Sequence, residues 1–107
     1  MEFFGKALSG PFTIPSGIVT TATPIIQYVF DHMPEVGVVT TKSIGLEPRT
    51  GNREPVYSQY APGCFVNAIG LTNPGAQAAR EALAALKIPA DRFLLASIFG
   101  GSIEEFV

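Results

Sequence analysis

The sequence has little of what disulfide-bonded, membrane-spanning and nucleic-acid-binding proteins need. A single cysteine, Cys64, excludes a disulfide within the chain. Seven basic against nine acidic residues give a net charge of −2 and no basic patch, which argues against a nucleic-acid partner. Uncharged apolar stretches such as 93–99 are far too short to cross a bilayer. The N-terminal residues lack a signal-peptide pattern, so we expect a cytoplasmic protein that does not associate with membranes.

The composition is that of a folded protein, with 47% hydrophobic and 15% charged residues. Short β-like segments alternate with helical ones, which favours an α/β fold with parallel strands covered by helices. The expected sheet strands are 11–16, 36–41 and 92–99. Two antiparallel hairpins are also expected, one over 3–8 and one formed by 56–60 with 64–67, the latter following the long connection 44–55.

Two helices are indicated by apolar spacing and by their end signals. In the first, Thr23 is the expected N-cap, Pro24 takes the first helical position, and Pro34 ends the helix. Its expected apolar face consists of Ile25, Ile26, Val29 and Phe30. The second helix is expected over 74–87, with Asn73 as its N-cap. Its apolar face would carry Ala79, Leu83 and Leu86.

The most informative stretch is 67–75, which places an amide side chain and open backbone N–H groups just before a helix. Gly70 allows the backbone to approach a ligand closely. Lys42, flanked by Thr41 and Ser43, follows an apolar strand. Because the carboxyl ends of parallel strands meet at one edge, we expect the Lys42 ammonium and the Asn67 carboxamide to face one site. Such a site suits a small anion.

Four segments in this order resemble the N-terminal third of dihydroorotate dehydrogenases: PFTIPSG at 11–17, TKS at 41–43, GNREP at 51–55 and NAIGLTNPG at 67–75. The resemblance implies a (β/α)8 TIM barrel, which needs about 250 residues. We therefore expect residues 1–107 to be the N-terminal fragment of a single FMN-binding barrel domain with about three barrel strands. Ser102 and Glu105 form a capping-box pattern that opens a further helix close to Val107, which favours the same interpretation.

The resemblance implies an enzyme that uses FMN to oxidise dihydroorotate to orotate in pyrimidine biosynthesis. Ser16, Gly17, Lys42 and Ser43 match the residues that bind the cofactor in this family. The substrate-binding positions that match are Lys42, Asn67, Ala68, Ile69, Gly70 and Leu71, where Lys42 approaches the substrate carboxylate and Asn67 binds the pyrimidine. No metal site is expected.

Two features depart from the family pattern or fall outside the chain. Pro15 stands where the family commonly has alanine, which changes the backbone beside the cofactor. The catalytic base of the family, a cysteine or serine on a later loop, is expected beyond Val107. Cys64 matches no base of the family, so we interpret it as a small packed or loop cysteine.

Within the family, residues 67–71 followed by 73–75 resemble the NAD-linked class. The catalytic subunit of that class associates with a second subunit that carries FAD and an iron–sulfur cluster. The fumarate-using class shares most of these positions, so the electron acceptor stays open. A homo-oligomeric parent protein is expected.

Two alternatives stay open beside the dehydrogenase. The first is a noncatalytic barrel fragment or interaction module, because three strands leave an open sheet edge and uncovered apolar surface. The second is an FMN oxidoreductase of the same family that acts on another pyrimidine. The 107-residue chain by itself is expected to be inactive.

Overall fold

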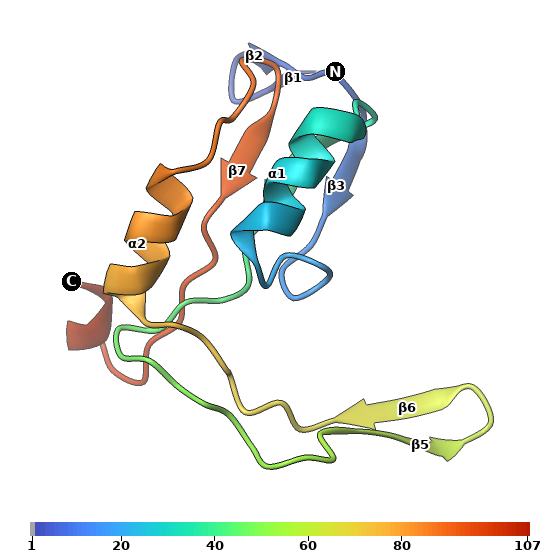
Figure 1. Cartoon of the computed structure of the whole chain (residues 1–107), viewed down its shortest axis with the longest axis vertical. Helices are drawn as coiled ribbons and strands as arrows, with labels where there is room; N and C mark the ends of the chain where they lie inside the picture. Colours follow the sequence, from blue (N-terminus) through green and yellow to red (C-terminus); the bar gives the residue numbers. More distant parts are fainter. Residues whose placement is uncertain (1) are drawn as a thin grey trace.

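A three-stranded parallel sheet forms the centre of the computed structural model, which describes residues 2–107. The strands are β3 (Phe12–Ile14), β4 (Val36–Thr40) and β7 (Phe93–Leu95), in the order β3-β4-β7. Helix α1 (Thr23–His32) connects β3 to β4, and helix α2 (Ala76–Ala84) precedes β7 (Figure 1). This arrangement confirms the predicted α/β class with a parallel sheet. The closed barrel stays an expectation from the family resemblance.

Strand β4 is the buried centre of the sheet, as predicted from its β-branched residues. It pairs with β3 on one side and β7 on the other, and Val39 is completely buried. Val36 and Val39 pack against Ile26, Val29 and Phe30 of α1 to form the core. Residues 41–43 follow directly from the end of this strand.

Helix α1 differs from the prediction at its start and on one face. Thr23 lies inside the helix, the N-cap is Ala22, and no side chain caps the first turn. Ile26, Val29 and Phe30 are buried as predicted, whereas Ile25 is 42% exposed because it lies away from β4. The helix ends at His32, whose ring nitrogen lies 3.0 Å from the Tyr28 carbonyl oxygen.

Helix α2 is shorter than predicted, and its N-cap is Gly75 rather than Asn73. The Asn73 carboxamide is used elsewhere, because its oxygen accepts hydrogen bonds from the N–H groups of Gly45 and Gly75 at 3.1 and 2.9 Å. Gly75 has φ of +83°, and a Cβ there would lie 2.8 Å from the nitrogen of Pro48. Glycine is therefore required where the chain enters α2. Ala79 is buried, and Leu83 and Leu86 are half-buried.

The N-terminal hairpin pairs β1 (Glu2–Phe3) with β2 (Lys6–Ala7), which confirms the predicted hairpin over 3–8. Lys6 Nζ donates a hydrogen bond of 2.8 Å to the carbonyl oxygen of Arg92. The Phe3 and Phe93 rings meet edge to face, with centroids 5.3 Å apart. These contacts place the hairpin at the amino end of β7, away from the carboxyl ends of the strands.

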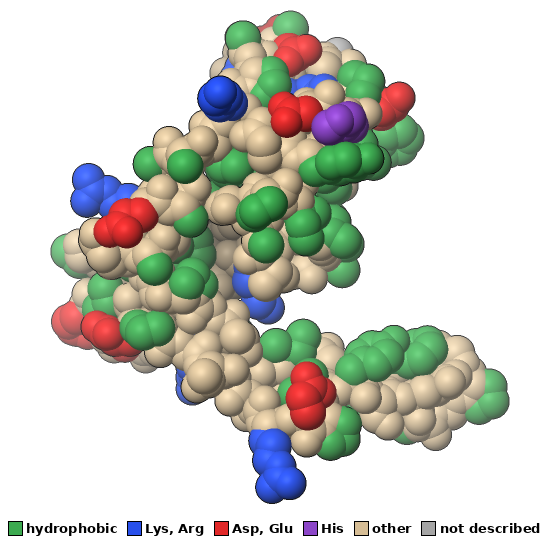
Figure 2. Space-filling view, viewed as in Figure 1, with side chains coloured by type: hydrophobic (Ala, Val, Ile, Leu, Met, Phe, Trp, Pro, Cys, Tyr) green, Lys and Arg blue, Asp and Glu red, His purple; other side chains and the backbone are tan. Residues whose placement is uncertain are grey.

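The second hairpin pairs β5 (Tyr57–Ala61) with β6 (Cys64–Asn67), close to the predicted positions. It projects from the body of the protein as an arm (Figure 1), and Figure 2 shows hydrophobic side chains gathered along it. The Tyr57 and Phe65 rings stack with centroids 5.4 Å apart, yet both side chains are more than half exposed. Cys64 is exposed on this arm.

The C-terminal part departs from the prediction in two places. Strand β7 covers only Phe93–Leu95, although an isolated parallel bridge between Ile44 and Ile98 continues its direction. The expected capping box is wrong: η1 (Glu104–Phe106) is a single 3-10 turn with Ile103 as its N-cap. The pKa of the Glu104 carboxyl is lowered, mainly by a backbone hydrogen bond at Glu104 itself and then by the Ser102 side chain.

No helix in residues 2–107 is both long and apolar enough to cross a membrane.

Replacement of Phe30 by alanine tests the core. Phe30 is 2% exposed, and its removal leaves a cavity between α1 and β4, so we expect the free energy of unfolding to fall by about 3–5 kcal/mol. The measurement is urea unfolding followed by circular dichroism. Tyr28→Ala is the matched control, because Tyr28 lies on the same helix but is 58% exposed. An equal loss in both variants would contradict this packing.

Candidate active site

Serine side chains from three loops meet at the carboxyl end of the sheet. Ser16 follows β3, Ser43 follows β4 and Ser97 follows β7. The Ser16 and Ser43 hydroxyl oxygens lie 3.2 Å apart, and those of Ser43 and Ser97 lie 2.9 Å apart. Parallel strands bring their carboxyl ends to one edge, and this edge carries the chemistry in barrel enzymes. We call these three residues the serine row.

Thr41 fixes the position of this edge. It is 3% exposed, its N–H donates to the Leu95 carbonyl at 2.9 Å, and its hydroxyl accepts from the Ser97 N–H at 3.1 Å. Both bonds tie the end of β4 to the segment that follows β7. The residues next along the chain, Lys42 and Ser43, therefore leave the sheet from a rigid base.

Lys42 brings a positive charge to this edge. Its backbone N–H donates to the Thr20 carbonyl at 3.2 Å, and its side chain is half-buried. A Cβ added to Gly17, which has φ of +83°, would lie 3.9 Å from Lys42 Nζ. Within residues 2–107, no carboxylate lies within 4.0 Å of this ammonium. Its charge is therefore available to an anionic ligand.

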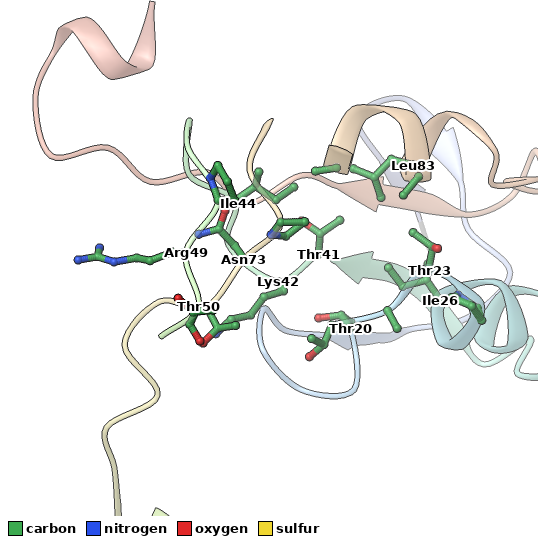
Figure 3. Close-up of a pocket in the computed structure, with 18 residues that line it drawn as sticks. Thr20, Thr23, Ile26, Thr41, Lys42, Ile44, Arg49, Thr50, Asn73 and Leu83 are labelled. Carbon is green, nitrogen blue, oxygen red and sulfur yellow. The ribbon is translucent and has the colours of Figure 1, made fainter. Parts of the chain in front are cut away.

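A pocket of about 780 Å³ opens beside this edge, between the start of α1 and the face of α2 that carries Ala79 and Leu83 (Figure 3). Thr41, Lys42 and Ile44 line it at the end of β4, and Asn73 lines it from the loop before α2. The serine row does not line this pocket. Lys42 therefore borders two parts of the edge. Its ammonium lies near Gly17, which adjoins the serine row, and its side chain also lines the pocket between the helices.

The stretch from Asn67 to Leu71 lies apart from Lys42. Asn67 ends β6, where it pairs with Tyr57, and it is exposed and does not line the 780 Å³ pocket. The Ala68 N–H donates to the Val56 carbonyl at 2.7 Å, and the Ile69 carbonyl accepts from Asn52 at 3.0 Å. The shared site of Lys42 and Asn67 therefore stays a prediction.

Gly70 and Leu71 contribute to a smaller pocket of about 280 Å³, which residues 49–52 also line. Gly70 has φ of +81°, and a Cβ there would lie 2.8 Å from the backbone nitrogen of Asn52. Leu71 also has a positive φ, 57°, which is uncommon for a residue with a side chain. Glycine at position 70 thus allows the backbone of this loop to lie directly against Asn52.

The sequence-predicted residues therefore form two groups, Ser16, Gly17, Lys42 and Ser43 at the sheet edge and the stretch 67–71 beside the arm. Ser97 and Thr41 were not predicted as site residues, although both contact this edge. A signal for Ser97 was present, because it follows the apolar strand 93–95 as Ser43 follows 36–40. The hydrogen bond between the Ser43 and Ser97 hydroxyls joins loops that are 54 residues apart, so no local sequence pattern indicates it.

Comparison with known proteins identifies the family. The model of the dihydroorotate dehydrogenase family matches residues 1–107. Three relatives are each named the catalytic subunit of dihydroorotate dehydrogenase B (NAD(+)). The Pyrococcus furiosus protein is 38% identical over 106 residues, covering 99% of this chain and 34% of its own length. The Pyrococcus abyssi protein is 37% identical with the same coverage. The Sulfolobus acidocaldarius protein is 32% identical over 107 residues, covering 100% and 35%.

The chain spans about a third of the length of these relatives. The match extends over the sheet edge and over the stretch 67–71, so the resemblance suggested by the four motifs is confirmed. The chain belongs to the dihydroorotate dehydrogenase family.

Proposed function

We propose that this chain is the N-terminal part of a (β/α)8 barrel enzyme that uses FMN to oxidise dihydroorotate to orotate in pyrimidine biosynthesis. Family membership supports the reaction. The observation that carries the proposal is the sheet edge itself, where a half-buried ammonium with no carboxylate partner among residues 2–107 lies beside a row of hydroxyls. Barrel enzymes bind their ligands at this edge.

The residues present fit FMN. A flavin ring needs close backbone approach together with hydrogen-bonding groups, and Gly17 offers an open backbone beside the Ser16 and Ser43 hydroxyls. Ser16, Gly17, Lys42 and Ser43 would hold the cofactor. When bound, FMN supplies the hydride acceptor for the oxidation. Pro15 fixes the backbone before Ser16 and therefore limits how the first loop can adjust to the ring.

Lys42 is proposed to bind the substrate carboxylate and to balance negative charge at the site. A charge-assisted hydrogen bond contributes about 1.5–3 kcal/mol. The half-buried position of Lys42 excludes part of the competing water, and its anchored backbone limits the entropy lost on binding. A partner carboxylate within the chain would weaken this role, and residues 2–107 place none within 4.0 Å.

The stretch 67–71 is proposed to hold the pyrimidine and the far side of its carboxylate. Asn67 would hydrogen-bond the ring, and Ala68, Ile69, Gly70 and Leu71 would offer their backbone. The positive φ of Leu71 supports this role, because strained backbone occurs often at ligand sites. The arm carrying Asn67 would have to bring the carboxamide and Lys42 to the same ligand.

Further components are proposed by analogy with the relatives. The relatives are named catalytic subunits of an NAD(+)-linked enzyme. We therefore propose that a second subunit, which carries FAD and an iron–sulfur cluster, transfers the electrons. We also propose a homo-oligomeric, cytoplasmic enzyme. The catalytic base would be a cysteine or serine in the part of the enzyme that corresponds to the remaining two thirds of the relatives.

A noncatalytic role is the second candidate for the 107-residue chain by itself. Its specific support is the outer edge of the sheet, where Phe12 of β3 is 64% exposed and, among the residues that the structure describes, β3 and β7 each pair only with β4. Open edges and exposed apolar side chains favour association with other chains.

A related oxidoreductase that acts on another pyrimidine differs from our proposal in one point. Such an enzyme would not require a carboxylate on its substrate.

The isolated 107-residue chain is predicted to bind no FMN tightly and to turn over no dihydroorotate, because it supplies one sheet edge of a ligand site that a closed barrel surrounds. The measurement is the visible absorbance of the purified chain. Flavin absorbance that copurifies with the chain and bleaches when dihydroorotate is added would contradict this prediction.

Replacement of Lys42 by alanine tests the carboxylate contact in the parent enzyme. Orotate binding, followed by the change in flavin absorbance, is expected to weaken about 10- to 100-fold, which corresponds to the loss of one charge-assisted hydrogen bond. Uracil lacks the carboxylate, so its binding should change little. Lys87→Ala is the control, because Lys87 is exposed beyond α2. Equal orotate affinity in the Lys42 variant and the original enzyme would reject the proposed role.

A further inference from the structure

Asn52, from the GNREP segment of the sequence, packs against the stretch 67–71. Its backbone N–H donates a hydrogen bond of 3.0 Å to the Ile69 carbonyl oxygen, and its side-chain Nδ2 donates one of 2.7 Å to the Ala68 carbonyl oxygen. A Cβ added to Gly70 would lie 2.8 Å from the backbone nitrogen of Asn52. One residue that was not predicted to belong to the site therefore contacts three successive residues of the proposed substrate-binding stretch.

The backbone before Asn52 is held close to the segment that it contacts. Arg49 and Asn73 exchange two backbone hydrogen bonds, of 2.9 and 3.0 Å. Gly51 has φ of +81°, and a Cβ there would overlap the Thr72 hydroxyl, so glycine is required for this close approach. Asn52 follows directly, so its position is fixed by the backbone on its N-terminal side.

The two hydrogen bonds from Asn52 set the direction of two N–H groups. The peptide bonds that follow Ala68 and Ile69 are trans. In a trans peptide the carbonyl oxygen and the N–H of the next residue point in opposite directions. Because both carbonyl oxygens point toward Asn52, the N–H groups of Ile69 and Gly70 both point away from it.

This pair of N–H groups suits an anion. Successive backbone N–H groups that face the same side form a concavity that binds anions. Neither the Ile69 N–H nor the Gly70 N–H donates a hydrogen bond within residues 2–107. A carboxylate has two oxygen atoms and can accept from both donors, whereas a pyrimidine without a carboxylate would leave this concavity unused.

We propose that Asn52 is a positioning residue that gives the site its preference for a pyrimidine that carries a carboxylate. It holds the peptide groups between Ala68 and Gly70 so that the N–H groups of Ile69 and Gly70 donate to that carboxylate. In this role Asn52 itself contacts neither the substrate nor the flavin. The inference rests on the proposed function, because it concerns the substrate of the same site.

Replacement of Asn52 by alanine in the parent enzyme tests the proposal. Asn52 is exposed in this chain, so water competes with its hydrogen bonds, and we expect orotate binding to weaken about 3- to 10-fold. Uracil lacks the carboxylate, so its affinity should change little. The KM for dihydroorotate should rise with the orotate dissociation constant while kcat changes little, because Asn52 lies outside the reacting groups. The measurements are flavin absorbance titrations and steady-state kinetics.

Two further variants separate the amide group from its surroundings. Asn52→Asp keeps the size of the side chain but removes the donor to the Ala68 carbonyl, so orotate binding should weaken at least as much as with alanine. Arg53→Ala is the matched control, because Arg53 is exposed and follows Asn52 directly. This control should leave the affinities for orotate and uracil unchanged.

The outcomes distinguish this inference from the proposed function. Orotate affinity that is the same in the Asn52→Ala variant and the unmodified enzyme would overturn this inference alone. Equal losses of orotate and uracil affinity, or loss of bound FMN, would also overturn it, because they would indicate a general disturbance of the fold. An unmodified enzyme that binds no orotate would instead reject the proposed function, and this inference with it.

Discussion

The pairing of β4 with two parallel neighbours is the constraint on which the rest of the structure depends. Val39 is completely buried between sheet and helix, and Thr41 ties the end of β4 to the segment after β7 through two hydrogen bonds. Lys42 and Ser43 follow at once, so their positions are determined by strand register rather than by a flexible loop. A slip of one residue would turn Lys42 to the opposite face.

The elements that the sequence predicts well are those whose signals are local. Val36, Val38 and Val39 form a short β-branched run that becomes the buried central strand. The α1 face was predicted because its apolar spacing matches one helical surface, although Ile25 lies just outside the contact with β4. The family resemblance followed from four short segments, of which 11–17 and 41–43 lie at the carboxyl ends of β3 and β4.

Asn73 was misplaced and Ser97 was missed because the side chains of both bind partners far away in the chain. Asn73 has the ideal chemistry for an N-cap, but its carboxamide binds the backbone of Gly45, 28 residues away, and Gly75 takes the cap position. Ser97 joins the serine row across 54 residues. Such long-range hydrogen bonds have no periodicity that a single sequence can reveal.

The central claim is that the carboxyl ends of β3, β4 and β7 form one ligand-binding edge with Lys42 as its cation. A crystal structure of the parent enzyme with FMN and orotate tests it most directly. The account predicts Lys42 Nζ within about 3.2 Å of an orotate carboxylate oxygen, with the flavin beside Ser16 and Ser43. Orotate bound far from Lys42, or a flavin that does not touch the serine row, would contradict it.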